Sequence, residues 1–301
     1  MTYDLMKIKS TLENYIFVLP ALIIFTVFYI IPFIWVFSLS FLDWNGIDII
    51  KIKESFIWLG NFKEILQDKF WWQAMRNVGY ITLIALTLQN ALAFLLAWAC
   101  DREIKLKNFY RLIFFIPPIL SEIVVGMVWR YLLNDIDGAN LLNRMLISTG
   151  FPQLVRHWLS DPAIALTTVA VVHSWKGFGW GFLIFLAGLQ TIPRELYEAA
   201  RVDGANAWES FKKITLPLMV PVAVVVAILT VLGTMQAFAL IIGLVGGELG
   251  GYTSVPVLRI LAAMQGSSRF GYACAQGITF GIVLVVISFI QYRFSKRYRE
   301  A

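Results

Sequence analysis

Long apolar runs separated by short polar segments make up most of this chain. A helix needs about 20 apolar residues to cross a bilayer. Six runs reach that length, at residues 15–42, 79–100, 112–133, 163–190, 217–245 and 273–292. The pattern predicts an all-α integral membrane protein in which residues 15–292 form one domain of six membrane-spanning helices.

The polar segment 191–216 is the longest charged, helix-forming stretch between two of these runs. Pro193 suits the first position of a helix, and Glu195 lies where the helix dipole favours a negative charge. The Asp203-Gly204 pair predicts the end of this helix. We therefore expect two short helices that meet at a glycine.

The second of these helices begins with a capping-box pattern, because Asn206 is followed three residues later by Glu209. Pro217 predicts a change of direction into the next apolar run. Each helix carries apolar residues at helical spacing, namely Leu196, Ala199, Ala200, Trp208, Phe211 and Ile214. Two interpretations of this face remain open: it packs on the membrane surface or on the chain's own helices, or it binds a partner.

The same segment contains Glu198-Ala199-Ala200, Asp203-Gly204-Ala205, Ile214, Leu216 and Pro217. This pattern resembles the EAA loop in the transmembrane subunits of ABC importers. The resemblance implies the type I ABC importer permease fold, with a cytoplasmic coupling helix that docks into a groove on the ATP-binding subunit. It assigns the coupling role to Glu195, Glu198, Ala199, Ala200, Asp203, Gly204 and Ala205.

The run at 183–190, followed by Ile192-Pro193, is similar to the carbohydrate branch of these permeases, the maltose-transporter type. This resemblance covers nearly the whole chain. It implies a permease subunit for sugars or oligosaccharides that forms half of a translocation pathway in a heteromeric complex. The implied partners are a second, related permease, two ATP-binding subunits that hold ATP and Mg²⁺, and an extracytoplasmic solute-binding protein.

Composition agrees with a membrane protein. Hydrophobic residues make up 59% of the chain and charged residues 15%, with a mean hydropathy of +0.72, whereas soluble domains carry about 25% charged residues. The net charge of +6 comes from lysines and arginines that flank apolar runs. These residues form no separate basic cluster, so we expect lipid and not nucleic acid as a partner.

Lysine and arginine are concentrated on one side of the predicted spans. The positive-inside rule places residues 1–14, the loop 191–216 and the basic tail 293–301 in the cytoplasm. The segment 43–78 then lies outside, as a polar loop of a multi-pass protein in the cell (inner) membrane. We expect Asn61 to cap a short amphipathic helix there, and we favour headgroup anchoring over partner docking for its tryptophans, Trp44, Trp58, Trp71 and Trp72.

Two charged residues fall inside predicted spans. Glu122 lies near the bilayer centre by its distance from the end of its run, where a carboxylate costs about 3 kcal/mol and usually faces a protein interior or an aqueous cavity. Lys176 lies at similar depth in the fourth span, so we expect it near Glu122. Glu122 is either a pathway residue, or it caps the backbone freed by Pro117 and Pro118 or is protonated. Both alternatives are open.

The fourth span also carries Trp175 and three alternate glycines, Gly177, Gly179 and Gly181. We expect these glycines either to unwind the helix or to let another backbone approach it closely. In the fifth span, Gln236 and Phe238 suit sugar hydroxyls and ring faces, although helix–helix packing is an equally good explanation. The candidate pathway residues are therefore Glu122, Trp175, Lys176, Gln236 and Phe238.

Signatures of catalysis are missing from the sequence. It contains no G-x-x-x-x-G-K phosphate loop, no H-E-x-x-H pair and no Cys/His cluster, and its two histidines are His157 and His173. We therefore expect no enzyme activity, no catalytic or metal-binding residues and no cofactor in this chain. The rival hypotheses are a proton-coupled secondary transporter that uses Glu122 and Lys176 as its relay, and a purely structural assembly subunit.

Overall fold

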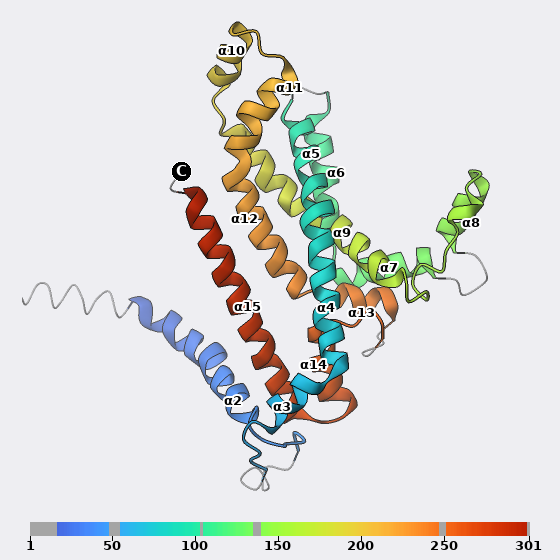
Figure 1. Cartoon of the computed structure of the whole chain (residues 1–301), viewed down its shortest axis with the longest axis vertical. Coiled ribbons are helices and arrows are strands. Elements are labelled where there is room, and N and C mark those ends of the chain that lie inside the picture. The colour runs from blue at the N-terminus through green and yellow to red at the C-terminus, as the bar shows by residue number, and fades with distance from the viewer. Residues whose placement is uncertain (1–16, 48–54, 103–104, 135–139, 247–250, 300–301) are drawn as a thin grey trace, which may run out of the picture. The chain divides into compact units, whose positions relative to one another are not determined.

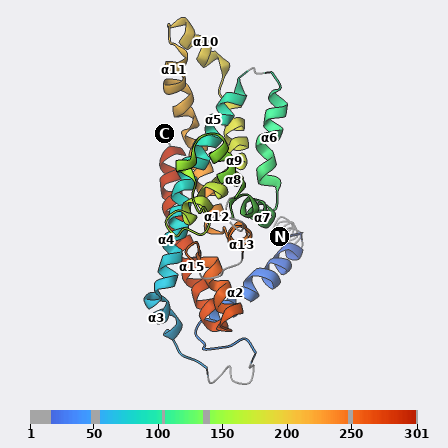
Figure 2. The ribbon, with the colours of Figure 1, turned by 90° about the vertical axis from the view of Figure 1, so that its right-hand side faces the viewer.

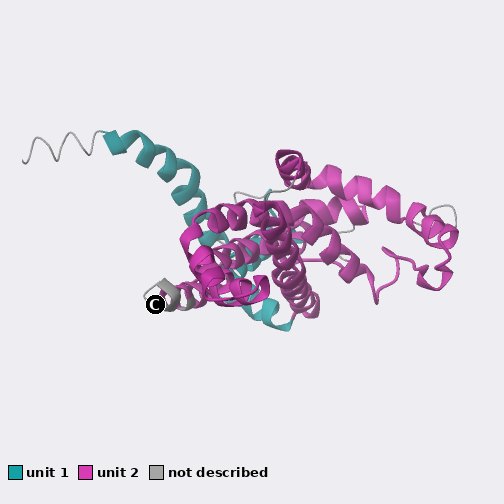
Figure 3. Ribbon diagram, turned by 90° about the horizontal axis from the view of Figure 1, so that it is seen from above, with its two compact units in different colours: residues 1–67, 263–280 teal, residues 68–262, 281–301 magenta. Residues whose placement is uncertain are grey.

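The computed structural model of the chain describes residues 17–47, 55–102, 105–134, 140–246 and 251–299 (Figure 1). The predicted cytoplasmic segment 1–14 lies outside these residues. The described parts are helical and contain no β-strand, only one isolated bridge between Leu42 and Phe56. The chain divides into two compact units (Figure 3): unit 1 comprises residues 1–67 and 263–280, and unit 2 comprises residues 68–262 and 281–301.

The membrane spans agree with the all-α prediction. Among the described residues, five helices are long and apolar enough to cross a bilayer: Phe17–Leu39, Lys69–Asp101, Ala165–Gln190, Ala207–Met235 and Phe270–Arg293. A sixth span requires that the bent pair Lys107–Ile119 and Glu122–Leu133 crosses as one unit. The expected run at 112–133 is therefore not one continuous helix, because its two halves meet at 96°.

Shorter elements make up these spans and the segments between them. They are η1 (Thr26–Ile30), α2 (Ile31–Leu39), α3 (Gly60–Gln67), α4 (Lys69–Ile84), η2 (Ala85–Gln89), α5 (Asn90–Asp101), α6 (Lys107–Ile119), α7 (Glu122–Leu133), α8 (Leu141–Ser148), η3 (Pro152–Leu154), α9 (Ala165–Gln190), α10 (Arg194–Val202), α11 (Ala207–Ser210), η4 (Phe211–Thr215), α12 (Leu216–Met235), α13 (Ala239–Val245), α14 (Pro256–Leu261), η5 (Ala262–Gly266) and α15 (Phe270–Arg299).

In unit 1, the turn after α2 is held by a buried amide. The Asn61 side chain donates to the carbonyl oxygens of Ser40 and Leu42 at 3.0 and 2.9 Å. Asn61 is the second residue of α3 and not its cap, so the capping prediction was wrong. Its role is set by a tertiary contact, because it supplies donors to the Ser40 and Leu42 carbonyls in the turn after α2.

The helix α9 is the centre of unit 2, with α4, α5, α6 and α12 packed around it. Its membrane-spanning stretch is 61% buried, against 28% for the Lys69–Asp101 and Ala207–Met235 helices. Small residues permit this packing: a Cβ at Gly181 would touch Ala93 of α5 and Val226 of α12. The glycines of α9 leave room for neighbouring helices to pack closely, and α9 is continuous through them. Of the two alternatives for the glycines at 177–181, the structure shows close approach of neighbouring helices and not unwinding.

Two further expectations are corrected in unit 2. Pro217 does not turn the chain, since helix continues from Ala207 to Met235 through the π-turn η4 just before the proline. With such a turn before it, the helix continues although proline has no backbone N–H to donate. Trp71 is fully buried on α4 and is not a headgroup anchor. The helix α4 begins at Lys69, inside the expected outer loop, because the Asp68 carboxylate caps it by accepting from Phe70 and Trp71.

Candidate functional site

The break between α6 and α7 places a charged residue against α9. Pro117 and Pro118 lie in the last turn of α6, and Leu120 is extended before α7 begins at Glu122. Pro118 has no N–H, so the Phe114 carbonyl loses its helical donor. Gly179 of α9 lies against that carbonyl, where any Cβ would collide with it. Proline on one helix and glycine on the other therefore allow α6 and α9 to approach closely.

The Glu122 and Lys176 side chains form an ion pair across this contact. The Lys176 Nζ atom donates to Glu122 Oε1 at 3.0 Å, and the side chains are 12% (Lys176) and 38% (Glu122) exposed. The expected proximity of the two charges is confirmed. Glu122 also stands in the first turn of α7, where the helix dipole favours a carboxylate.

Further polar atoms are buried along this part of unit 2. His173 lies one turn before Lys176 on α9 and is 8% exposed, and its Nδ1 atom has no hydrogen-bond partner. The Oε1 atom of Gln89 is also unpartnered, and its amide lies against Gly177. Unpaired buried acceptors are costly. The interior of this region therefore contains buried polar atoms that have no hydrogen-bond partner among the described residues. The sequence did not indicate the contribution of Gln89.

Trp175 lies beside the ion pair. Its ring meets Trp129 of α7 edge to face, with ring centroids 5.4 Å apart, and 37% of the residue is exposed. It also lines an apolar cavity of about 450 Å³ between α6 and α9, together with Leu92, Ile113, Phe114, Ile116, Pro117 and Phe178. The indole thus joins α7 to α9 and keeps a free surface.

A second break holds the remaining pathway candidates. The helix α12 ends at Met235 and α13 begins at Ala239, so the fifth span is shorter than the expected 217–245. Gln236 and Phe238 lie in the intervening turn, and both are exposed. Among the described residues, no hydrogen bond connects Gln236 with the Glu122–Lys176 pair. The structure therefore brings three of the five candidates together and leaves two at a separate turn.

The two short helices that follow the breaks pack against each other. A Cβ on Gly126 of α7 would strike the Leu240 carbonyl of α13, and one on Gly243 would strike the Ile123 carbonyl of α7. Glycine at both positions lets the backbones touch. The sequence gives no sign of this crossing, because the two glycines are far apart in the chain and stand in no shared motif.

The predicted coupling residues form a compact turn at one end of unit 2 (Figures 1 and 2). The Gly204 amide donates to the Arg201 carbonyl at 3.1 Å, and the Ala205 amide donates to the Ala200 carbonyl at 2.9 Å. These two bonds make a Schellman motif, which requires a left-handed residue. Gly204 supplies it with φ +81°. Pro193 precedes α10 as its N-cap and is not its first helical residue.

The second helix of the turn has the predicted capping box. The Asn206 side chain accepts from the Trp208 and Glu209 amides at 3.0 Å, and the Glu209 carboxylate accepts from the Asn206 amide at 2.9 Å. The Tyr197 hydroxyl is 2.9 Å from the Thr215 hydroxyl and so ties α10 to η4. Within unit 2 the turn is therefore a defined structure with its own hydrogen bonds.

The apolar face of this turn is only partly covered within unit 2. Leu196 is 42% exposed and Trp208 is 67% exposed, and Val202 at the end of α10 is 88% exposed. Glu195, Glu198 and Ala199 are exposed, and Ala200 and Ala205 are half-buried. The face therefore offers a surface of small and apolar groups flanked by two carboxylates.

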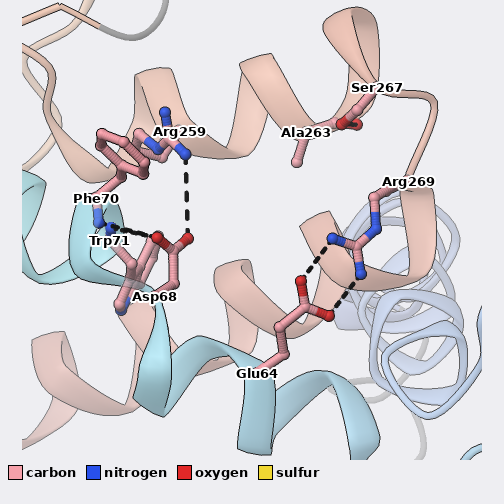
Figure 4. Close-up of polar contacts among 8 residues, drawn as sticks. All are labelled: Glu64, Asp68, Phe70, Trp71, Arg259, Ala263, Ser267 and Arg269. Carbon is pink, nitrogen blue, oxygen red and sulfur yellow. Dashed lines mark hydrogen bonds and ion pairs between the residues drawn. The ribbon is translucent and has the colours of Figure 1, made fainter.

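Polar contacts that the sequence analysis did not predict hold the two units internally (Figure 4). In unit 1, Arg269 donates two hydrogen bonds to the Glu64 carboxylate, each 2.6 Å, and these bonds raise the pKa of Arg269 above its usual value. In unit 2, the Arg259 guanidinium is 4.0 Å from the Asp68 carboxylate and 5.3 Å from the centre of the Phe70 ring. Because these partners are far apart in the sequence, no local sequence pattern predicts the contacts.

Within the described ranges, no group of three or more His, Cys, Asp and Glu side chains is placed to hold a metal ion. What the geometry offers is a polar, partly accessible break in the middle of unit 2 and an exposed helical turn at its end.

The family of the chain follows from comparison with known proteins. Residues 89–300 match the family of binding-protein-dependent transport system inner membrane components. The chain belongs to this family, and it is a membrane-embedded transport component.

Individual relatives match over most of their length. The trehalose/maltose transport system permease protein MalF of Thermococcus litoralis is 32% identical, over 93% of this chain and 92% of its own. The arabinooligosaccharides transport system permease protein AraP of Bacillus subtilis is 30% identical, over 95% and 89%. A solved bacterial alginate ABC transporter, in complex with an alginate pentasaccharide-bound periplasmic protein, contains a chain with a TM-score of 0.78 and 25% identity, covering 97% of this chain and 96% of its own.

Proposed function

We propose that this chain is a permease subunit of an ATP-driven ABC importer for sugars or oligosaccharides. The family membership and the carbohydrate names of the two relatives support the substrate class. The chain supplies half of the translocation pathway, and a second, related permease supplies the other half. An extracytoplasmic solute-binding protein delivers the sugar, a role supported by the periplasmic protein in the alginate transporter complex.

The observation that carries the coupling part of this proposal is the α10–α11 turn. Its Schellman motif and capping box fix its shape without a partner, while its apolar face stays exposed. A rigid amphipathic helix with small residues fits a groove on another protein. We assign this groove to an ATP-binding subunit, which binds ATP and Mg²⁺. Closure of two such subunits then moves the turns and rocks the helices between inward-facing and outward-facing states.

Two substitutions test the coupling role. Glu198→Lys reverses a charge on the docking surface, and Gly204→Val places a branched side chain at a positive φ. Both variants are expected to insert in the membrane but to lose co-purification with the ATP-binding subunit, or sugar-stimulated ATP hydrolysis. Arg76→Glu, a charge reversal on the exposed face of α4, is the matched control for insertion and ATPase binding. Normal ATPase binding and uptake in both test variants would refute the coupling role.

We place the pathway at the two helix breaks. Glu122 and Lys176 offer charged hydrogen-bonding groups, Gln236 offers an amide, and Trp175 and Phe238 offer exposed ring faces, which together suit a polyhydroxylated ring. Gln236→Ala and Trp175→Ala are expected to raise the apparent KM for sugar uptake about tenfold, which corresponds to one lost contact of about 1.4 kcal/mol. An unchanged KM in both variants would remove these residues from the pathway.

The Glu122–Lys176 pair also favours one alternative, the proton-coupled secondary transporter, because a partly buried acid–base pair is what a relay needs. Purified protein in liposomes distinguishes the two functions. Uptake driven by a pH gradient without ATP supports the relay, whereas uptake that requires the ATP-binding subunit and ATP supports the importer. ATP-driven uptake with this chain as the sole permease would refute the heteromeric assembly.

A further inference from the structure

A cavity of about 740 Å³ lies in unit 2 between the C-terminal end of α5 and the α10–α11 turn. Its volume is in the range of small-molecule sites. Four of its lining residues are basic, Arg102, Lys107, Arg194 and Arg201, and two are acidic, Asp101 and Glu198. The lining therefore carries a surplus of positive charge.

Among the described residues, the basic groups of this cavity form no ion pair. Within the described part of the chain, no carboxylate is within 4.0 Å of these four side chains. The Lys107 Nζ atom has one contact, a donation to the Asp101 carbonyl oxygen at 3.4 Å. Several like charges that line one cavity repel each other, so an anion between them would be stabilised.

Aromatic rings fix the position of one guanidinium. The Arg102 group lies 4.2 Å from the centre of the Trp98 ring, and Trp98 in turn packs on Phe211 with centroids 4.8 Å apart. Stacking on a ring restricts the guanidinium plane and leaves its N–H edge free to donate. Tyr197 completes the aromatic part of the lining, and its hydroxyl contacts Thr215.

A further basic residue on α6, outside the cavity lining, lacks acceptors. Arg111 lies one turn after Lys107 on α6, and its Nε and Nη2 atoms are buried without a hydrogen-bond partner. Buried guanidinium donors that remain unpaired are costly. The Arg111 guanidinium therefore lacks acceptors one helical turn away from Lys107, which lines the cavity.

We propose that this cavity binds a phosphate ester. Phosphate oxygens accept from guanidinium and ammonium groups in short charge-assisted bonds, and basic pockets between helices bind anionic headgroups. The chemistry is shared by two sources, the headgroup of an anionic phospholipid and a soluble phosphate ester. The site lies next to the coupling turn, so its occupancy would hold α10 against the end of α5.

The test is a direct binding measurement on the full chain in neutral detergent. Dihexanoyl-phosphatidylglycerol is expected to bind saturably, and dihexanoyl-phosphatidylcholine, whose choline cancels the phosphate charge, about tenfold more weakly or not at all. Glycerol 1-phosphate separates the sources. If it binds as tightly as the lipid, the ligand is a soluble ester. If only phosphatidylglycerol binds, the ligand is a membrane lipid. Binding of neither anion would overturn the proposal.

A charge-matched pair of variants locates the binding. Arg102→Gln combined with Lys107→Gln is expected to weaken phosphatidylglycerol binding at least about tenfold. The control combines Lys105→Gln with Lys212→Gln, two exposed residues that do not line the cavity, and it should bind within about twofold of the unmodified chain. Equal loss in both double variants would refute the site.

A charge-preserving variant is the control for a folding defect. Lys107→Arg, which keeps the charge and leaves Arg102 stacked on Trp98, is expected to retain most of the affinity, and loss of binding there would point to misplaced packing and overturn the charge argument. Neither ATPase nor sugar takes part in these measurements. Failure of the phosphate site and failure of the proposed transport function are therefore separate results.

Discussion

The α10–α11 turn and the α6–α7 break are both places where a helix stops in unit 2, but they stop for different reasons. At the turn, the bonds that end α10 and begin α11 join residues two to five positions apart, such as Ala205 to Ala200. At the break, Glu122 is paired with Lys176, 54 residues away. One feature is built from local bonds and the other from tertiary contact.

This difference decides how each region tolerates change. The turn is exposed, so a substitution there costs the local bond or strain alone. The break lies among packed helices, where a new atom must displace a neighbouring backbone and a removed charge leaves its partner unpaired. Matched substitutions in the two regions should therefore give unequal losses of stability.

The largest expected effect is at the ion pair. Glu122→Gln leaves the Lys176 ammonium without its counter-charge, and it should lower the free energy of unfolding in mixed micelles by about 3 kcal/mol. Glu195→Gln on exposed α10 should change it by less than about 0.5 kcal/mol. The double exchange of Glu122→Lys with Lys176→Glu should recover part of the loss. Equal effects at Glu122 and Glu195 would contradict the comparison.

Next in size is the crossing of α7 and α13. Gly126→Ala places a methyl group on the Leu240 carbonyl and should destabilise the protein by about 2 kcal/mol, because neither backbone can yield without moving its helix. The control is Gly233→Ala in α12, where the space is open. There alanine should stabilise the helix by up to about 1 kcal/mol. Opposite signs for these two changes, measured by unfolding in mixed micelles, would confirm that packing decides the outcome.

A smaller effect is expected at the Schellman glycine. Gly204→Ala meets no neighbouring atom but must adopt φ +81°, which costs about 1 to 2 kcal/mol for a residue with a Cβ. Gly204→Asn should cost less, since asparagine tolerates this conformation. If alanine and asparagine gave the same midpoint of thermal unfolding, backbone strain would not be the reason for glycine here.

The smallest effect is at the cap of α11. Asn206→Ala removes the acceptor for two amides and should cost about 1 kcal/mol, confined to this helix. Hydrogen exchange should show faster exchange at the Trp208 and Glu209 amides and no change in α9. Asn206→Asp keeps the acceptor and should exchange as the unmodified chain does. Faster exchange in α9 would mean that the turn is not locally stabilised.

The sequence by itself predicted the features that depend on interactions between near neighbours along the chain. The apolar runs, the stop at Gly204, the capping box at Asn206 and the absence of a phosphate loop all depend on neighbours within a few residues. The structure confirms the stop at Gly204 and the capping box, and among the described residues five of the six expected spans correspond to single helices. Even the Glu122–Lys176 pair could be expected, since two opposite charges at similar depth in apolar surroundings need each other.

Tertiary structure decided what local pattern left open. The sequence could not tell that α6 and α7 meet at 96°, that the glycines of α9 receive its neighbours instead of unwinding it, or that Asn61 serves carbonyls some 20 residues away. A helix break, a close backbone approach and a buried amide each depend on what lies opposite. The physical reason is that packing partners are determined by proximity in the folded structure, so they produce no periodic pattern along the sequence.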